Sequence, residues 1–413
     1  NTTIYFTGLE PVIDLTPGTL TVNATDGANA VNYALGDNSG TAVVNNVVSG
    51  QVSVDNFETV EFINKTVLVI NGLAGDDSIN LNHLGTPSGL ATITVTGGDP
   101  TASDEVIYNG TGFSDDIVVT PLNPDSAFVS DGVRPSVEVF TTESLVINGG
   151  EGPDTLEVDL TSLLSQNNTI EYTPGDTVNS GHIQVDSTIP ISFVNLGAEG
   201  FLFNSVFFTD EFGSDTLVYN GTDGADNFVV EDNRISLFSP IGEHETVFSS
   251  GEDGIERLWL KGLGGDDTFD IRGSVFTGAE GGGILVEGGQ PDSGSDTVIY
   301  GAEGNVTVDL VDNTINDVST PSSPDITLVG VEDVTVNAFG YNVSVIGGSD
   351  DDAVDVTPLG ASSVQTQLQG SGTLFEFNNI DDFTVDVLGG NDTLTVNGTA
   401  GADMISLSQG VVD

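Results

Sequence analysis

The sequence predicts an all-β protein, built as a repetitive β-solenoid of the parallel β-helix or β-roll kind. Apolar and polar residues alternate over short runs such as 91–95 and 305–310, and Gly, Asn and Asp bound the runs. Glycine-rich turns follow one another about every 20–26 residues, for example from Gly72 to Gly97, which suits the coils of a solenoid. A string of tandem β-sandwich domains of about 100 residues each is the alternative. Helical periodicity is nearly absent, and only 156–164 resembles a helix.

Two phrases recur along the chain, which is the pattern of a repeat protein. The first is a strand, a glycine–acidic turn and a second strand, with copies at 68–81, 145–160 and 258–271 and weaker ones at 343–356 and 385–396. The second begins with Asn-Gly-Thr or a relative of it, with copies at 108–119, 219–230 and 396–407 and a degenerate one at 22–33. Strands that carry Glu or Asp, such as TESLVI and VEDVTV, precede the turns of the first phrase.

The order of these phrases divides the chain into repeat segments. We expect segments at 1–109 (its N-terminal part incomplete), 110–220, 221–300 and 301–397 (degenerate), and the start of a truncated segment at 398–413. Joined tail to head, the two ends would form the middle of one segment. The chain is therefore expected either to be a slice of a longer repeat protein or to be completed head to tail by neighbouring subunits.

Composition excludes several classes of function. The chain of 413 residues has 63 acidic and 6 basic side chains, a formal net charge of −57, and no cysteine. Six basic residues cannot build a face that neutralises nucleic-acid phosphates or anionic lipids. The absence of cysteine excludes disulfide scaffolds, thiolate metal sites and cysteine nucleophiles. No run of 18 apolar residues occurs, so we expect no membrane insertion. A polyanion of this size needs high salt or divalent cations to offset its self-repulsion.

The turns of both phrases match the nonapeptide G-G-x-G-x-D-x-U-x, in which U is a large apolar residue. The copy at 149–157 fits every fixed position, and those at 72–80 and 262–270 have Leu in second place. Glycine permits left-handed backbone that directs carbonyl groups inward, and Asp supplies the hard oxygen that Ca²⁺ prefers. Turn chemistry alone, with Asp capping its own backbone, is the other interpretation.

These turns resemble the repeats-in-toxin (haemolysin-type) calcium-binding family of secreted bacterial proteins. The resemblance covers about a fifth of the chain. In that family the nonapeptides stand in tandem, whereas here they are isolated, so ion sites would require the turns of longer coils to stack. The resemblance implies Ca²⁺ as the cofactor. The acidic run 350–352 is expected to be a solvated loop. The expected calcium ligands are Asp76, Asp77, Asp154, Asp226, Asp266, Asp267 and Asp403.

The sequence offers no recognisable catalytic machinery, so we expect no enzyme activity. His83, His182 and His244 stand alone, and neither a G-x-S-x-G elbow nor a P-loop occurs. The segment Arg257-Leu258-Trp259-Leu260-Lys261 is unusual in this acidic chain. It is interpreted as a strand whose basic residues face nearby carboxylates, with sugar stacking on Trp259 as the alternative.

We expect an extracellular structural protein that self-assembles head to tail into a surface layer, sheath or filament, with calcium or high salt neutralising its acidic turns. A calcium-dependent adhesin stalk and a carbohydrate-active β-helix enzyme are the alternatives. Polymerisation of the isolated protein would favour the structural protein over the adhesin stalk. Glycans are possible on the N-x-S/T sequons, which chance also produces in such a composition. The sequons begin at Asn1, Asn23, Asn64, Asn109, Asn167, Asn220, Asn305, Asn342, Asn391 and Asn397.

Overall fold

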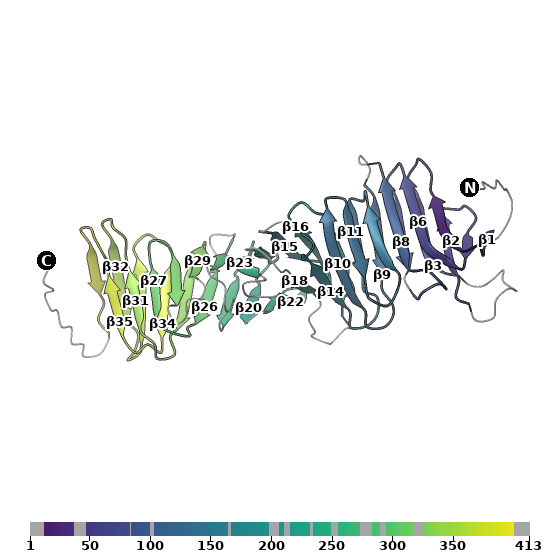
Figure 1. Cartoon of the computed structure of the whole chain (residues 1–413). Helices are drawn as coiled ribbons and strands as arrows, with labels where there is room; N and C mark the ends of the chain where they lie inside the picture. The colour runs from purple at the N-terminus through teal and green to yellow at the C-terminus, as the bar shows by residue number, and fades with distance from the viewer. Residues whose placement is uncertain are drawn as a thin grey trace. The chain divides into compact units, whose positions relative to one another are not determined.

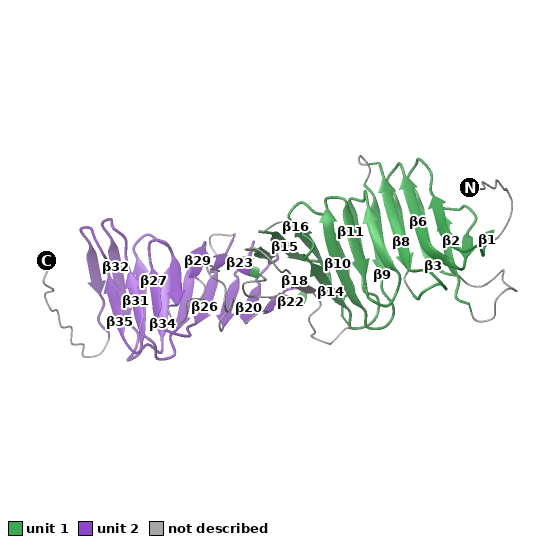
Figure 2. Cartoon of the chain, viewed as in Figure 1, with its two compact units in different colours: residues 1–220, 241–255 green, residues 221–240, 256–413 purple. Residues whose placement is uncertain are grey.

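The computed structural model describes residues 12–36, 47–82, 84–99, 103–163, 167–197, 206–209, 215–231, 234–248, 255–272, 283–289, 295–317 and 325–399. These residues form 36 β-strands and no helix (Figure 1). In the described part of the chain, no helix has the length and apolar character needed to cross a membrane. The chain divides into two compact units, unit 1 (1–220 with 241–255) and unit 2 (221–240 with 256–413) (Figure 2).

In unit 1 the strands belong to two mixed sheets, which we call sheet A and sheet B. In order of pairing, sheet A contains β1 (Val12–Asp14), β5 (Val60–Phe62), β4 (Gly50–Val54), β3 (Ala30–Leu35), β7 (Ser78–Asn82), β9 (Glu105–Asn109), β13 (Ser144–Asn148), β17 (Ile191–Val194), β16 (Gly181–Val185), β15 (Thr169–Pro174) and β19 (Asp215–Asn220). Sheet B contains β2 (Gly18–Asn23), β6 (Lys65–Leu73), β8 (Thr92–Gly98), β12 (Ser136–Phe140), β11 (Ser126–Ser130), β10 (Asp116–Asn123), β14 (Thr155–Asp159), β18 (Val206–Thr209) and β22 (Gly242–Phe248).

Unit 2 has the same arrangement. Its sheet A contains β23 (Ile255–Lys261), β25 (Gly283–Glu287), β29 (Asp325–Val329), β28 (Thr314–Asp317), β27 (Val306–Asp309), β31 (Val343–Ile346) and β35 (Phe383–Asp386). Its sheet B contains β21 (Arg234–Ser239), β20 (Asn227–Glu231), β24 (Thr268–Arg272), β26 (Thr297–Gly301), β30 (Asp333–Asn337), β34 (Leu374–Asn378), β33 (Ser363–Leu368), β32 (Ala353–Pro358) and β36 (Thr393–Val396).

The chain passes from one sheet to the other and back, so that strands on successive passes pair in parallel. β6 and β8 pair in parallel in sheet B, and β7, which lies between them in sequence, pairs in parallel with β9 in sheet A. Three-stranded antiparallel meanders interrupt this alternation, for example β3–β4–β5 and β10–β11–β12. The sheets are therefore mixed, and the sequence phrases mark the parallel passes.

The core follows from the alternation of apolar and polar residues. In sheet B, Leu68 lies in register with Ile93, which lies in register with Val137, and all three are 0% exposed. Because every second residue of a strand points to the same face, the parallel register stacks like side chains into columns. Aromatic residues stack in the same way, since Phe228 and Phe269 are register partners whose ring centroids are 4.7 Å apart.

The stretch at 156–164, which resembles a helix in sequence, forms no helix in its described part, 156–163. Residues 155–159 form β14, and Leu160 follows as a buried residue before a turn in which the Leu163 N–H donates to the Leu160 carbonyl. Leu156, Val158 and Leu160 are buried while the residues between them point outward, which is the period of a strand. Two acidic residues on the outer face gave this stretch its helix-like polarity.

An asparagine ladder runs along one end of the strands of sheet A in unit 1. The side-chain amide of Asn109 donates to Asn80 Oδ1 (2.5 Å), Asn148 donates to Asn109 (2.8 Å), and Asn195 donates to Asn148 (2.9 Å). Asn71 donates to Asn23 in sheet B in the same way, at 2.7 Å. In each pair the donor lies later in the chain than the acceptor, so the ladder has a direction.

Candidate functional site: carboxylate ladders at the turns

The glycine–aspartate turns hold buried carboxylates that bind successive turns together. In unit 1, Asp77 is 2% exposed and its Oδ1 accepts the backbone N–H of Asn29 (2.8 Å). The N–H of Asp77 donates to Asp104 Oδ1 (2.8 Å), and the N–H of Asp104 donates to Glu143 Oε2 (2.8 Å). We call this series, Asn29, Asp77, Asp104 and Glu143, the first carboxylate ladder.

A second carboxylate ladder in unit 2 repeats this pattern with Asp226, Asp267, Asp296 and Glu332. The N–H of Asp226 donates to Asp267 Oδ1 and the N–H of Asp267 to Asp296 Oδ1, both at 2.8 Å. The N–H of Asp296 donates to Glu332 Oε2 at 2.9 Å. In both ladders a glutamate occupies the last position, and all bonds run from a backbone N–H to the carboxylate that lies later in the chain.

Shorter versions of the ladder occur at other turns. The N–H of Asp115 donates to Asp154 Oδ1 at 2.9 Å, and the N–H of Asp352 donates to Asp392 Oδ1 at 3.0 Å. Asp352 is 9% exposed, so the expectation that 350–352 is a solvated loop is wrong for this residue, although Asp350 and Asp351 are exposed. The buried Asp352 carboxylate accepts the N–H of Gly348 in its own turn at 2.6 Å, while its backbone N–H makes the bond to the next turn.

The glycines of the motif exist because each leaves space for a carboxylate. A Cβ on Gly262 would lie 2.2 Å from Asp267 Oδ2 and 2.2 Å from the Gly288 carbonyl oxygen. A Cβ on Gly72 would lie 2.4 Å from both Asp77 Oδ2 and the Gly97 carbonyl oxygen. The spacing Gly-x-x-x-x-Asp therefore places a carboxyl oxygen and the carbonyl oxygen of the next turn against the same glycine.

Burial raises the pKa of these carboxyls. Loss of solvent raises the pKa of Asp104 to about 6, and the charges of Asp77 and Glu143 act in the same direction. Loss of solvent also raises the pKa of Asp154 to about 6 and that of Asp267 to about 7, against the lowering effect of the N–H bond that each accepts. Near neutral pH these groups can therefore take up a proton, unlike ordinary surface carboxylates.

One oxygen of several ladder carboxyls is buried without a hydrogen-bond donor. This holds for Oδ2 of Asp77, Asp104, Asp154 and Asp267. The point beside Gly262 that lies 2.2 Å from both Asp267 Oδ2 and the Gly288 carbonyl is the Cβ position, about one covalent bond length from the glycine Cα. Because this point is so close to the glycine Cα, a calcium ion cannot occupy it. The two oxygens therefore do not form a calcium site at that point.

The structure places the expected calcium ligands in two environments. Asp77, Asp154, Asp226 and Asp267 are buried ladder members, whereas Asp76 and Asp266 are exposed beside them. Asp403 lies outside the described residues. Among the residues that are described, no three His, Cys, Asp or Glu side chains are grouped so as to hold one metal ion. Calcium at these turns stays a prediction, with the exposed members and the backbone carbonyls as its donors.

Ladder members that lie outside the regular motif were not found from the sequence. Asp104 and Asp296 follow their glycines, Gly97 and Gly288, by seven and eight residues instead of five. The sequence signal for Glu143 was the acidic residue in TESLVI, and for Glu332 the same residue in VEDVTV. Both segments stood out as acidic strands, but without a role.

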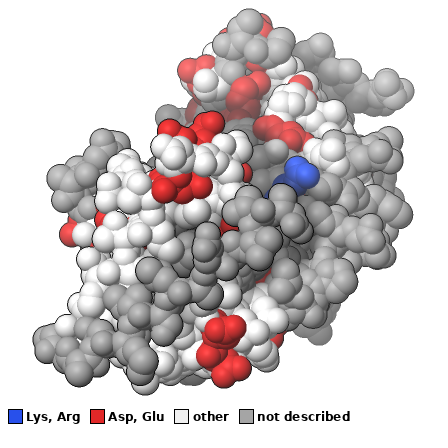
Figure 3. Space-filling view, turned by 90° about the vertical axis from the view of Figure 1, so that its left-hand side faces the viewer, with Lys and Arg blue, Asp and Glu red and all other residues white. Residues whose placement is uncertain are grey.

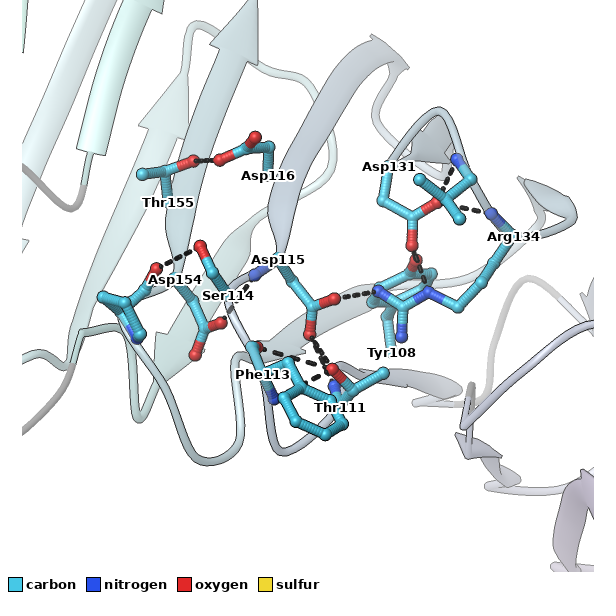
Figure 4. A network of polar contacts seen from close by, with 12 residues as sticks. Tyr108, Thr111, Phe113, Ser114, Asp115, Asp116, Asp131, Arg134, Asp154 and Thr155 are labelled. Carbon is cyan, nitrogen blue, oxygen red and sulfur yellow. Dashed lines mark hydrogen bonds and ion pairs between the residues drawn. The ribbon is translucent and has the colours of Figure 1, made fainter.

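A protein cation, Arg134, neutralises the carboxylates next to one turn. Its Nη2 lies 2.8 Å from Asp115 Oδ1, and its Nε donates to Asp131 (Figure 4). The Tyr108 hydroxyl donates to Asp131 Oδ2 at 3.2 Å. Burial opposes ionisation of Asp131, but the backbone N–H groups of Arg134 and Val133 and the guanidinium outweigh it and hold its pKa below the usual value. Arg134 thus joins the β11–β12 loop to the turn before β10.

Replacing Arg134 with Met should destabilise unit 1 by about 3 kcal/mol, because it leaves Asp115 and Asp131 buried without a counter-ion. The matched control is Arg272→Met, since the Arg272 side chain is 53% exposed and pairs with Asp270 on the surface. That change should cost less than about 1 kcal/mol. Urea unfolding followed by circular dichroism measures both. Equal losses in the two variants would contradict the role given to Arg134.

Two of the three histidines and the tryptophan lie among the described residues. His182 Nδ1 contacts Ser192 Oγ at 3.3 Å, His244 is 3% exposed, and His83 lies outside the described residues. Trp259 donates its indole N–H to Glu287 (3.1 Å), and the Lys261 ammonium lies 4.1 Å from the ring centroid. The ring face toward Lys261 is thus covered, which leaves less of the ring open to a sugar.

The acceptor nitrogens of the sequons at Asn64, Asn109, Asn220 and Asn397 donate hydrogen bonds to other described residues. Asn220 is 6% exposed and its Nδ2 donates to Glu171 and Thr173, both at 2.9 Å. The Nδ2 of Asn109 is bonded within the asparagine ladder. A glycan on any of these nitrogens would displace its hydrogen bond. By contrast, Asn391 has an exposed side chain.

No protein-family profile matches the chain, and no similar protein was found among curated proteins.

Proposed function

We propose that this chain is an extracellular structural protein whose copies assemble end to end into a surface layer, sheath or filament, and that its alternating sheets are the coils of a solenoid. The observation that carries the proposal is an incomplete core at the terminal strands. Leu394 and Val396 in β36 are 48% and 42% exposed, whereas their register partners Val354 and Val356 in β32 are 1% and 7% exposed.

The opposite terminal strand has the same property. Leu20 and Val22 in β2 are half-buried, while their register partners Leu68 and Ile70 in β6 are 0% exposed. Core positions left half covered at an open sheet edge invite the addition of a further strand. In a repeat protein each coil is covered by its neighbours, so strands that lack a covering strand among the described residues gain the most burial on assembly.

The acidic surface sets the conditions under which such an assembly forms. Acidic side chains stand in separate groups on the face shown in Figure 3, and the chain carries a formal net charge of −57. Copies of such a polyanion repel one another at low ionic strength. Calcium bound at the exposed turn carboxylates such as Asp76 and Asp266, or a high salt concentration, would reduce this repulsion.

Negative-stain electron microscopy of the purified chain, with calcium and then with excess chelator, tests the proposal. We expect filaments or sheets with calcium that come apart in chelator at low salt. Assemblies that survive chelator would keep the structural role and remove calcium from it. Uniform single particles under all conditions, including high salt, would overturn self-assembly and favour the adhesin stalk.

A further inference from the structure

We infer that β2 of a second copy of this chain pairs with the free edge of β36, as a parallel strand in register. The inference rests on the proposed end-to-end assembly and specifies its interface. Three independent features of the two strands support it: their sequence, their exposed core positions and the direction of their side-chain hydrogen bonds.

The two strands have the same sequence. Residues 19–23 and 393–397 both read Thr-Leu-Thr-Val-Asn. Identical strands that stack in parallel and in register place like side chains beside like, and this allows close packing between chains. Here Leu20 would lie beside Leu394, and Val22 beside Val396.

The proposed pairing covers the exposed apolar side chains on the core face of each strand. Leu394 and Val396 occupy the core side of β36, because they are in register with buried residues of β32. Leu20 occupies the core side of β2 for the same reason, through its pairing with Leu68 of β6. A shift of register by one residue would turn Thr side chains into both cores. Only the in-register arrangement or a shift by two residues keeps the apolar positions together.

The asparagines select between these two registers. In every asparagine pair described above, Nδ2 of the later residue donates to Oδ1 of the earlier one. Asn23 uses its Oδ1 for Asn71, and its Nδ2 makes no hydrogen bond with the described residues. Asn397 uses its Nδ2 for Thr357 at 2.9 Å, and its Oδ1 has no donor among the described residues. In register, Nδ2 of the second copy's Asn23 meets Oδ1 of Asn397, with the direction of the existing ladder.

The backbone also favours this partner. Among the described residues β36 pairs only with β32, and β2 pairs only with β6, both in parallel. Each strand therefore has one edge whose N–H and C=O groups face no strand of the described chain. A parallel strand on each edge would extend the pairing that the sheets already use on successive passes of the chain.

Cysteine cross-linking of the full chain tests the register, since the protein has no cysteine of its own. Thr21 and Thr395 are exposed residues on the outer face of β2 and β36. Adjacent strands lie about 4.8 Å apart, within the Cα separation that a disulfide spans. A mixture of the single variants Thr21→Cys and Thr395→Cys should therefore form a disulfide-linked dimer under mild oxidation, read on a non-reducing gel.

The matched control mixes Thr21→Cys with Thr335→Cys, which places the thiol on the outer face of β30, away from any sheet edge. We expect about tenfold more dimer from the first mixture than from the control. Equal yields would overturn the inference. Filaments seen by microscopy in the same samples would then leave the proposed function standing with a different interface, whereas single particles would remove both.

A second variant tests the interface without cysteine. Leu394→Lys adds a charge at a position that is 48% exposed in the single chain, so thermal unfolding should change little. The fraction that sediments as assemblies should fall about tenfold, because the lysine would be buried against Leu20 of the next copy. Unchanged sedimentation with intact folding would overturn the inference.

Discussion

Gly262→Ala should destabilise unit 2 by roughly 3 kcal/mol or more, although the change adds a single methyl group. The new Cβ would lie 2.2 Å from Asp267 Oδ2 and 2.2 Å from the Gly288 carbonyl oxygen. The carbonyl belongs to the backbone of the next turn and cannot rotate away. Relief requires Asp267 to leave its place, and its Oδ1 would then release the N–H of Asp226, a bond of 2.8 Å between buried groups.

The matched control is Gly389→Ala, in another Gly-Gly turn of unit 2. A Cβ at Gly389 meets no atom within 4 Å, and neither glycine has a positive φ. The alanine there should leave stability within about 0.5 kcal/mol of the parent or raise it slightly, because it restricts the unfolded chain. Urea unfolding of both variants decides the matter. If the two variants have equal stability, Gly262 is not needed to leave room for the Asp267 carboxylate.

The all-β class and the turn motif could be predicted from the sequence because both are local. Alternation fixes which residues of a strand share a face, and this is why Leu68 and Ile70 are in the core as the pattern requires. The aspartate of the nonapeptide was identified as a special residue at Asp77, Asp154 and Asp267, and all three are buried.

The partners of those aspartates could not be predicted, because they depend on which turns stack. Asp77 accepts from Asn29, which is 48 residues away, and donates to Asp104, which is 27 residues away. The three-stranded meanders make these separations irregular, and no period in the sequence reports them. The asparagine ladder escaped notice for the same reason, since Asn109 and Asn148 become neighbours only through the parallel register of β9 and β13.

Lowering the pH from 7.5 to about 4.5 should raise the free energy of unfolding of this protein. Asp104 and Asp154 have pKa values of about 6 and Asp267 one of about 7, all raised by burial above the value of 3.8 that applies to the unfolded chain. Over this interval the folded state binds more protons than the unfolded state. The contribution of these three groups to the free energy of unfolding is therefore fully present below pH 3.8, and it is lost as the pH rises through 6 to 7. Each group contributes on the order of 3 kcal/mol.

Other carboxyls act in the opposite direction, but in a lower range of pH. Asp14, Asp55 and Asp131 have lowered pKa values, so their contribution is lost only as the pH falls below the usual carboxyl range. Taken together, the shifts place the maximum of stability in mildly acidic solution. Thermal unfolding at constant ionic strength, in the presence of a chelator, would show this as a midpoint that rises from pH 7.5 to about 4.5.

Asp267→Asn separates the ladder from the general charge of the surface. The amide keeps an oxygen for the N–H of Asp226 and places an uncharged NH₂ at the buried Oδ2 position beside Gly262. Asn29 already occupies the first position of the other ladder. We expect the variant to be more stable than the parent at pH 7.5 by roughly 2 kcal/mol and to lose part of the pH dependence.

Asp266→Asn makes the same change of net charge on an exposed neighbour and should do neither. Should Asp267→Asn instead lose stability at pH 7.5 while Asp266→Asn does not, the buried carboxyl works in its ionised form, as it would with a bound cation.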